Sequence, residues 1–140
     1  MSEVKIQQVK GSTFAARGWS NHWLIMDAPE KSGGSGAANS PMEVILLGLG
    51  GCTAVDVETI LKKMKLVVEN IEIDIIAERA EVHPKVYTKI DMTYHIYGRN
   101  LPLAKLERAV KLSKDTYCSV SAMLKNTVEI NATIENHNTA

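Results

Sequence analysis

The sequence has few aromatic residues and no excess of charge of either sign. Its 140 residues include one Phe, two Trp and four Tyr, and 16 Lys and Arg residues balance 16 Asp and Glu residues. Proteins that bind nucleic acids or anionic membrane surfaces carry clusters of positive charge. We therefore expect neither a nucleic-acid partner nor a membrane partner.

Long apolar stretches are also lacking. The longest uncharged apolar run, residues 44–55, is shorter than the roughly 20 residues that a membrane-spanning helix needs. The first five residues lack the apolar segment that is typical of a secretory signal peptide. We therefore expect a cytoplasmic protein, and the length predicts a single domain over residues 1–140.

Cysteine is scarce too, with only Cys52 and Cys118 in the chain. In the cytosol such cysteines are more often reduced, catalytic or redox-sensing than joined in a structural disulfide. They lack the CxxC spacing of zinc sites, and the histidines are scattered over expected strands and loops. These histidines, which we expect at the surface or at strand edges, are His22, His83, His95 and His137. We therefore expect no metal and no cofactor.

Apolar and polar residues alternate in three stretches of the C-terminal half, which predicts strands with one solvent-exposed face. These stretches are residues 71–78, 86–96 and 128–135, and residues 82–85 form a hairpin between the first two. The first 27 residues alternate less regularly and predict two or three short strands. A helix is predicted from Pro102 to about Asp115, with Ser113 in its apolar stripe.

A long helix is predicted from Pro41 to about Lys65. Ser40 has the chemistry of an N-cap, proline is favoured at the first helical position, and Glu43 completes a capping box. Before this helix, the run Lys31-Ser-Gly-Gly-Ser-Gly36 predicts a mobile surface loop.

The first half of this helix is apolar on every side. A helix of this kind must be covered on every side, and one small sheet is not enough. The glycines at positions 48, 50 and 51 each cost about 1 kcal/mol relative to alanine, and close approach of another element would compensate. We therefore expect a second subunit.

Cys118 follows the predicted second helix and precedes a short apolar stretch, residues 120–124. A thiol at a helix N-terminus has a lowered pKa because of the helix dipole. Cys52 lies within the apolar helix, where a small buried hydrophobic residue is the alternative interpretation. Together the two cysteines favour a redox centre.

Two motifs surround these cysteines. The first is Ser40-Pro-Met-Glu, followed by Gly-Gly-Cys52-Thr-Ala-Val-Asp56-Val and Leu61-Lys-Lys-Met64; the second is Lys114-Asp-Thr-Tyr-Cys118-Ser-Val-Ser. These two motifs, and the order in which they and the predicted strands and helices follow one another, resemble those of the OsmC/Ohr family of thiol peroxidases. The resemblance extends over nearly the whole chain. The resemblance implies an OsmC-like α+β fold, with antiparallel sheets wrapped around two central long helices in an intertwined homodimer.

The resemblance also implies an activity, the reduction of organic hydroperoxides and hydrogen peroxide in an oxidative stress response. Cys52 would be the peroxidatic cysteine and would form a sulfenic acid, and Cys118 would resolve it as an intramolecular disulfide. We therefore expect the two residues to lie close enough to bridge. A small dithiol or a lipoylated protein would then reduce the disulfide, as is implied for the family.

Members of the family stabilise the thiolate with an arginine that is held by a glutamate. Arg17 is the candidate arginine of this chain. The family's glutamate position, directly after the proline, is occupied by Met42. Glu43 lies one residue later and, at about 100° per residue, faces away from Cys52, so its capping role is favoured over a catalytic one. Asp56 shares a helix face with Cys52 and is a further candidate site residue.

An alternative remains open within the same fold. The protein would then be a non-catalytic or ligand-binding OsmC-like protein, with an apolar pocket at the dimer interface for a small hydrophobic molecule and with merely buried cysteines. Other thiol chemistry, such as protein disulfide exchange, is a further alternative.

Overall fold

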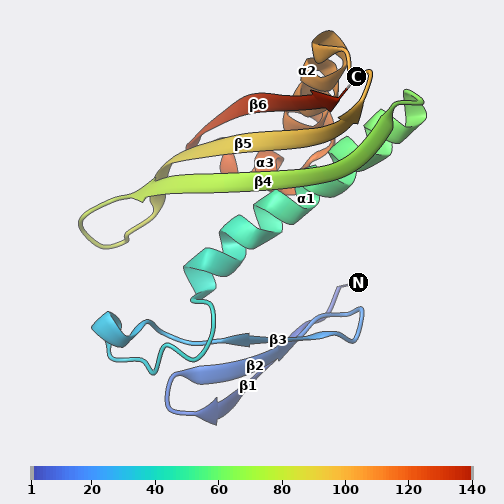
Figure 1. The fold of residues 1–140 in the computed structure, drawn as a ribbon. Coiled ribbons are helices and arrows are strands. Elements are labelled where there is room, and N and C mark those ends of the chain that lie inside the picture. The colour runs from blue at the N-terminus through green and yellow to red at the C-terminus, as the bar shows by residue number, and fades with distance from the viewer. Residues whose placement is uncertain (1, 140) are drawn as a thin grey trace. The chain divides into compact units, whose positions relative to one another are not determined.

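The fold contains two three-stranded sheets and a small number of helices (Figure 1). The structure, a computed structural model, describes residues 2–139. The contacts divide the chain into two compact units, Met1–Leu47 and Gly48–Ala140, and each unit is described by itself. The expected α+β class is confirmed. The single domain over residues 1–140 stays a prediction.

The N-terminal unit begins with a meander of three antiparallel strands. Its strands are β1 (Lys5–Lys10), β2 (Thr13–Arg17) and β3 (Trp23–Met26), in the order β1-β2-β3. They confirm the two or three short strands that the irregular alternation predicts. A short 3₁₀ helix, η1 (Glu30–Ser32), follows.

Asp27 anchors the loop after β3, because its side chain accepts hydrogen bonds from several directions. The hydroxyl groups of Ser12, Thr13 and Ser35 donate to its carboxylate. The hydrogen bonds from Ser12 and Ser35 hold the pKa of the carboxyl group well below its usual range. The mobility predicted for residues 31–36 stays a prediction, but Ser35 within that segment has a fixed partner.

The long helix α1 (Pro41–Lys63) begins as expected. The N–H of Ser40 donates to Glu43 Oε2 at 2.6 Å, and the N–H of Glu43 donates to Ser40 Oγ at 3.3 Å. These two bonds form the predicted capping box. The hydrogen bonds from Ser40, chiefly the one from its N–H, lower the pKa of Glu43. Further along, α1 buries a stripe of residues four apart, Leu49, Thr53, Val57 and Leu61.

The C-terminal unit contains the second sheet, in the order β4-β5-β6. Its strands are β4 (Val67–Arg79), β5 (Tyr87–Arg99) and β6 (Glu129–Thr139). A hairpin joins β4 and β5 antiparallel, but β6 pairs parallel with β5. The sheet is therefore mixed, whereas the resemblance to the OsmC/Ohr family implies antiparallel sheets. The reason is that the chain crosses over through helices before β6, and such a connection returns the strand in the same direction.

The helices between β5 and β6 are α2 (Leu103–Leu112), the π-helical turn η2 (Ser113–Tyr117) and α3 (Ser119–Leu124). The core of this unit is formed by the inward-facing residues of β5 and the buried faces of α1 and α2. Its fully buried side chains include Leu49, Val57, Leu61, Ile90, Tyr94, Ile96, Leu106 and Ala109. The predicted second helix is thus correct up to residue 112, where the π-helical turn replaces it.

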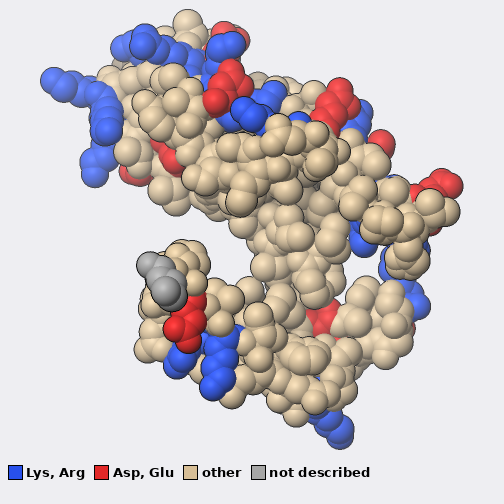
Figure 2. Space-filling model, turned by 180° about the vertical axis from the view of Figure 1, so that it is seen from behind, with Lys and Arg blue, Asp and Glu red and all other residues tan. Residues whose placement is uncertain are grey.

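Within the described part of the C-terminal unit, the other face of α1 is uncovered. Gly48, Gly51 and Val55 lie on this face, opposite the buried stripe at about 100° per residue, and Val55 is 66% exposed. A Cβ atom at Gly48 or Gly51 would meet nothing within 4 Å. By length and composition alone α1 would also be able to cross a membrane, a test that core helices pass as well. On the face shown in Figure 2, charges of both signs are interspersed and leave large uncharged areas.

Candidate redox site at Cys52 and Cys118

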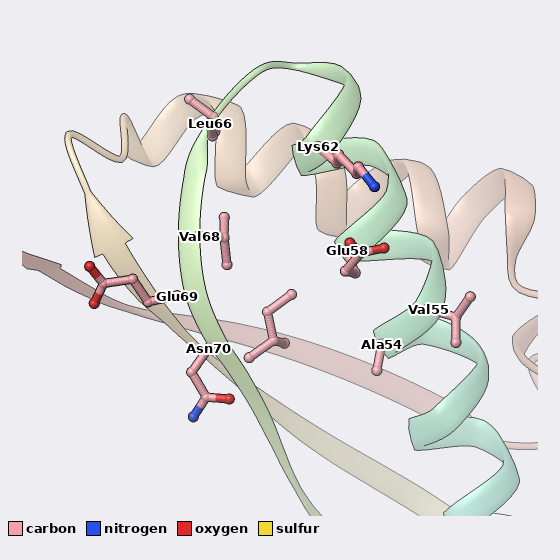
Figure 3. A pocket seen from close by; sticks show the side chains of 9 residues that line it. Ala54, Val55, Glu58, Lys62, Leu66, Val68, Glu69 and Asn70 are labelled. Atoms are coloured by element: carbon pink, nitrogen blue, oxygen red, sulfur yellow. The ribbon is translucent and has the colours of Figure 1, made fainter.

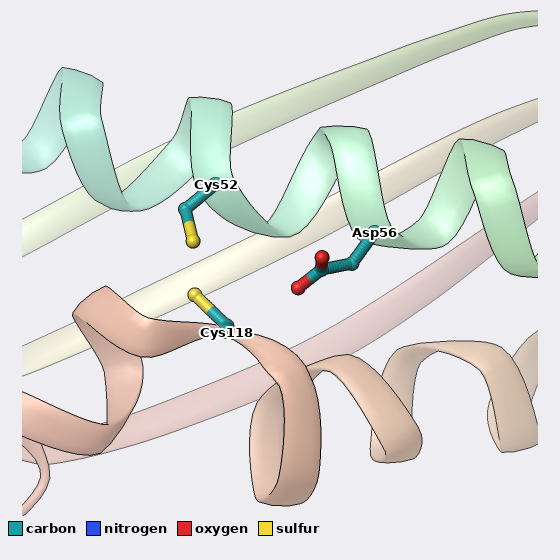
Figure 4. Close-up of side chains that lie close together, drawn as sticks. All are labelled: Cys52, Asp56 and Cys118. Atoms are coloured by element: carbon teal, nitrogen blue, oxygen red, sulfur yellow. The ribbon is translucent and has the colours of Figure 1, made fainter.

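Cys52 and Cys118 lie next to each other in the C-terminal unit. Cys52 is on α1, Cys118 precedes α3, and both thiols are free. Their sulfur atoms and a carboxylate oxygen of Asp56 all lie within 4.8 Å of one another. Figure 4 shows the two sulfur atoms pointing toward each other, with the Asp56 side chain beside them. The expected proximity of the two thiols is therefore present, and a small approach would bring them to the S–S bond length of about 2.05 Å.

The π-helical turn η2 determines where Cys118 lies. The N–H of Cys118 donates to the carbonyl oxygen of Ser113 at 2.7 Å, which closes the wide turn. Cys118 then has an extended backbone and caps α3, and its Sγ accepts a hydrogen bond from the N–H of Ser121 at 3.4 Å. Single π-turns are frequent at functional sites. Here the turn places a thiol at a helix start, facing α1.

The two thiols differ in their surroundings. Cys118 is 2% exposed, whereas Cys52 is half-buried. Burial raises the pKa of the Cys118 thiol, and the hydrogen bonds from Ser121 oppose this only in part. The expectation that the helix N-terminus lowers the pKa of Cys118 is therefore wrong. The helix start is present, but desolvation of the thiolate outweighs it.

A chain of buried hydroxyl groups ends at Asp56. Ser113 Oγ donates to Asp56 Oδ2 at 3.0 Å, Thr53 Oγ1 lies 2.8 Å from Ser113 Oγ, and Tyr94 Oη lies 2.7 Å from Thr53 Oγ1. A hydroxyl group has one proton to donate. Since Ser113 gives its proton to Asp56, Thr53 donates to Ser113 and Tyr94 donates to Thr53. This series of hydrogen-bonded hydroxyl groups holds the Asp56 carboxylate beside the two thiols.

No sequence pattern placed Thr53, Tyr94 or Ser113 at the site. Two signals were available, because Ser113 is a polar residue in an apolar helix stripe and Tyr94 lies on the inward face of a predicted strand. Both are fully buried, as is Thr53. Buried polar groups need partners, and these three residues supply them to one another.

A cavity of about 470 Å³ opens beside Asp56. Its lining includes Ile60, Met64 and Leu112 from the helices, and Tyr117, which directly precedes Cys118. A larger pocket lies between α1 and β4 (Figure 3), and neither cysteine lines either of these two pockets. The smaller cavity lies nearer the thiols, because Asp56 and Tyr117 line it, and its apolar side chains are joined there by the polar residues Thr59 and Lys63.

The other candidates, Arg17 and Glu43, belong to the N-terminal unit. The Arg17 guanidinium group lies 5.7 Å from the ring centroid of Trp23, the residue opposite it on β3. The role of Arg17 at the thiolate stays a prediction. Glu43 is engaged in the capping box with Ser40, the role that the sequence analysis favours for it.

Three comparisons bear on the identity of the chain. The sequence matches the family described as OsmC-like protein over residues 33–133. It is 39% identical over 134 residues to Protein YhfA of Escherichia coli K12, which covers 95% of this chain and 96% of that protein. A crystal structure of a hypothetical protein from Aquifex aeolicus VF5 is 31% identical, with a TM-score of 0.88 over 100% of this chain and 98% of that chain.

A more distant match shows the fold alone. The organic hydroperoxide resistance protein OsmC from Legionella pneumophila is 17% identical, with a TM-score of 0.73 over 96% of each chain. The family match covers more than half of this chain, and the YhfA match covers nearly all of it. The chain therefore belongs to the OsmC-like family.

Proposed function

We propose that this protein is a thiol-dependent peroxidase that reduces organic hydroperoxides with Cys52 and Cys118. The observation that carries the proposal is the pair of free thiols that face each other within 4.8 Å, one half-buried and the other buried. The family supports it, since some structural neighbours are named organic hydroperoxide resistance proteins. The name of YhfA, by contrast, states no activity.

The unequal burial of the two thiols suggests their roles. A thiolate is the nucleophile in such reactions, and burial disfavours the thiolate of Cys118. Cys52 is the more accessible thiol and is the attacking residue. Its sulfur attacks the outer oxygen of the peroxide ROOH and breaks the O–O bond, so that Cys52 becomes a sulfenic acid and the alcohol ROH leaves with the proton.

Cys118 then completes the oxidative half of the cycle. Its sulfur attacks the sulfur of the Cys52 sulfenic acid, a disulfide forms, and the hydroxyl group leaves as water with the thiol proton. Two electrons have passed from the two thiols to the peroxide. A small dithiol or a lipoylated protein returns them by thiol–disulfide exchange, with attack on the more accessible sulfur of Cys52.

The cavity beside Asp56 supports an organic substrate. Side chains of Ile60, Met64 and Leu112 line it, and these would cover the hydrocarbon part of a hydroperoxide. Arg17 remains the proposed stabiliser of the Cys52 thiolate. Asp56, which is fixed by Ser113, is proposed to position the second thiol rather than to attract an anion.

A homodimer belongs to the same proposal. The uncovered apolar face of α1 with Gly48 and Gly51 supports it, because close approach of a second α1 would fill the open space at both glycines. An obligate interface of this kind buries roughly 2,000 Å² or more. The cytoplasmic location is likewise retained as a proposal.

Peroxide turnover in matched variants tests the proposed activity. We expect the wild-type protein to consume cumene hydroperoxide with a dithiol as reductant, and Cys52→Ser to lose this activity at least about 100-fold. Cys118→Ser should allow one oxidation of Cys52 per chain and then stop, since the disulfide that the dithiol reduces no longer forms. Ser119→Ala, which changes the exposed neighbour of Cys118, should turn over at the wild-type rate.

Two results would contradict the proposal. Equal activity of wild-type protein and Cys52→Ser would exclude Cys52 as the attacking residue. No consumption of peroxide by folded wild-type protein would leave the alternative, a non-catalytic OsmC-like protein that binds a small hydrophobic ligand.

A further inference from the structure

A second cluster of reactive side chains lies on the outer face of the sheet β4-β5-β6, away from the cysteines. It contains His95 on β5, Glu135 and His137 on β6, and Asp74 on β4. Residues of one strand alternate between the two faces of a sheet. Tyr94 points inward to Thr53 of α1, so the adjacent His95 points outward. The cluster is therefore independent of the proposed peroxidase site.

The parallel pairing of β5 and β6 brings these residues together. His95 is the register partner of Glu135, and Tyr97, two residues further along β5, is the partner of His137. The spacing of the histidines in the sequence showed no ligand pattern, because the residues that meet here come from strands on either side of the helical crossover. The structure supplies this pairing.

Three donor atoms of the cluster are spaced as metal ligands are. His95 Nδ1 lies 3.1 Å from His137 Nε2, and Glu135 Oε2 lies 3.8 Å from the former atom and 3.9 Å from the latter. An ion placed centrally between them would lie about 2.1 Å from each atom, which matches the Zn–N and Zn–O distances of protein sites.

The surroundings hold both imidazole rings in place. The Nε2–H of His95 donates to Asp74 Oδ2 at 2.9 Å, so that Nδ1 of a neutral His95 keeps its lone pair free to bind a metal. Such a carboxylate–histidine pair is the usual second shell of a zinc ligand. The ring of His137 stacks on Tyr97, with centroids 4.3 Å apart and planes 9° apart. The side chains of His95 and His137 are 18% and 37% exposed, so the site is open to ions from solution.

We propose that His95, Glu135 and His137 bind one divalent transition-metal ion, with Zn²⁺ as the best fit, and that Asp74 is a positioning residue. Two imidazoles and one carboxylate select zinc and its neighbours over Mg²⁺ or Ca²⁺, which prefer oxygen ligands alone. Three protein ligands leave one position on the solvent side for water or a further ligand. This proposal departs from the expectation of no metal, which nothing in the structure tests.

Calorimetric titration with Zn²⁺ tests this proposal on the reduced full-length chain, purified without a polyhistidine tag. The wild-type protein should bind one ion per chain. His137→Gln and Glu135→Gln should each weaken this binding at least about tenfold, and Asp74→Asn should weaken it by about tenfold while one ion still binds. Glu78→Gln, a matched change on the same face of β4, should bind as tightly as the wild type. Circular dichroism of each variant checks its fold, and the exposed Glu135 gives a second ligand variant if His137→Gln fails to fold.

The thiols offer an alternative site, because Cys52, Asp56 and Cys118 also have donor atoms within 4.8 Å of one another. If Zn²⁺ still binds to Cys52→Ser but binds more weakly to Glu135→Gln, the site formed by His95, Glu135 and His137 is supported. Binding that is lost in Cys52→Ser and unchanged in both His137→Gln and Glu135→Gln would overturn the proposal. Absence of binding by the wild-type protein up to about 1 mM Zn²⁺ would also overturn it and would leave a metal-free hydrogen bond between the two imidazoles. The peroxidase proposal is tested separately, by peroxide turnover of the Cys52→Ser and Cys118→Ser variants.

Discussion

Tyr94 connects the core of the C-terminal unit to the candidate redox site. Its ring is fully buried, and its hydroxyl donates to Thr53, the first of the hydroxyl groups that lead to Asp56. Burial, with smaller contributions from the charges of Cys118 and Asp56, raises the pKa of Tyr94 from 10.0 to about 12. The phenol therefore stays protonated in the folded protein well beyond the pH at which it ionises in the unfolded chain.

This shift predicts a loss of stability in alkali. Between pH 10 and about 12 the unfolded chain releases the Tyr94 proton and the folded chain keeps it, so the free energy of unfolding falls as the pH rises. Tyr94→Phe should be less stable than wild type by about 1 kcal/mol near pH 8. At about pH 11 the wild-type protein should have lost about 1.4 kcal/mol of stability relative to Tyr94→Phe.

Urea unfolding of both proteins at the two pH values measures this effect. The control is Tyr117→Phe, which removes the hydroxyl group of an exposed tyrosine outside the buried chain of hydroxyl groups. A stability gap between wild type and Tyr94→Phe that stays constant from pH 8 to pH 11 would contradict the buried hydrogen-bonded phenol.

Single residues of the site were predictable to different degrees. Tyr94 occupies one of the apolar positions in the alternating pattern of its strand, and Ser113 lies in the apolar stripe of a helix. Both positions indicated that the side chains are buried. The meeting of these residues with Thr53 was not predictable, because it depends on where α1 crosses β5. The surroundings of Asp27 were not predictable for the same reason. Its carboxylate accepts hydrogen bonds from Thr13 on β2 and from Ser35 in the loop after β3, which only the fold brings together.

At the scale of elements, local chemistry fixed the start of α1. The capping box of Ser40 and Glu43 involves neighbours in sequence, so the pattern was enough to predict it. The direction of β6 was not predictable in this way, because alternation of apolar and polar residues is the same in parallel and antiparallel strands. The π-helical turn η2 interrupts a helix whose apolar stripe gives no sign of it.

The exposed face of α1 carries a prediction about assembly. Val55→Asp places a charge where the proposed dimer buries an apolar side chain, and the cost of burying an unpaired charge should raise the dimer dissociation constant at least about tenfold. Ile76→Asp on β4 is the control, since Ile76 is 73% exposed but lies on the outer face of the sheet. Analytical ultracentrifugation over a range of micromolar concentrations gives the association state of each protein. A monomeric wild-type protein would contradict the proposed dimer.

At the scale of the whole molecule, topology decides which reactive groups meet. Cys52 and Cys118 are separated by two strands and two helical segments, and their joint interpretation as a redox centre came from their sequence settings and from the resemblance to the OsmC/Ohr family. His95 and His137 are separated by the same helical crossover, and no pattern in the sequence indicated that they would meet. The strand and helix periodicities predicted the elements, but contacts between distant segments required the fold.

The central claim is that peroxide oxidises Cys52 and that Cys118 then closes a disulfide within the same chain. Peptide mapping by mass spectrometry, after anaerobic treatment of the reduced protein with an equimolar amount of cumene hydroperoxide, tests it most directly. We predict the loss of both thiols, a linked pair of peptides that contain Cys52 and Cys118, and no disulfide-linked dimer on a non-reducing gel. Oxidation of Cys118 with Cys52 still a free thiol, or two intact thiols after exposure to about 1 mM peroxide, would contradict the account.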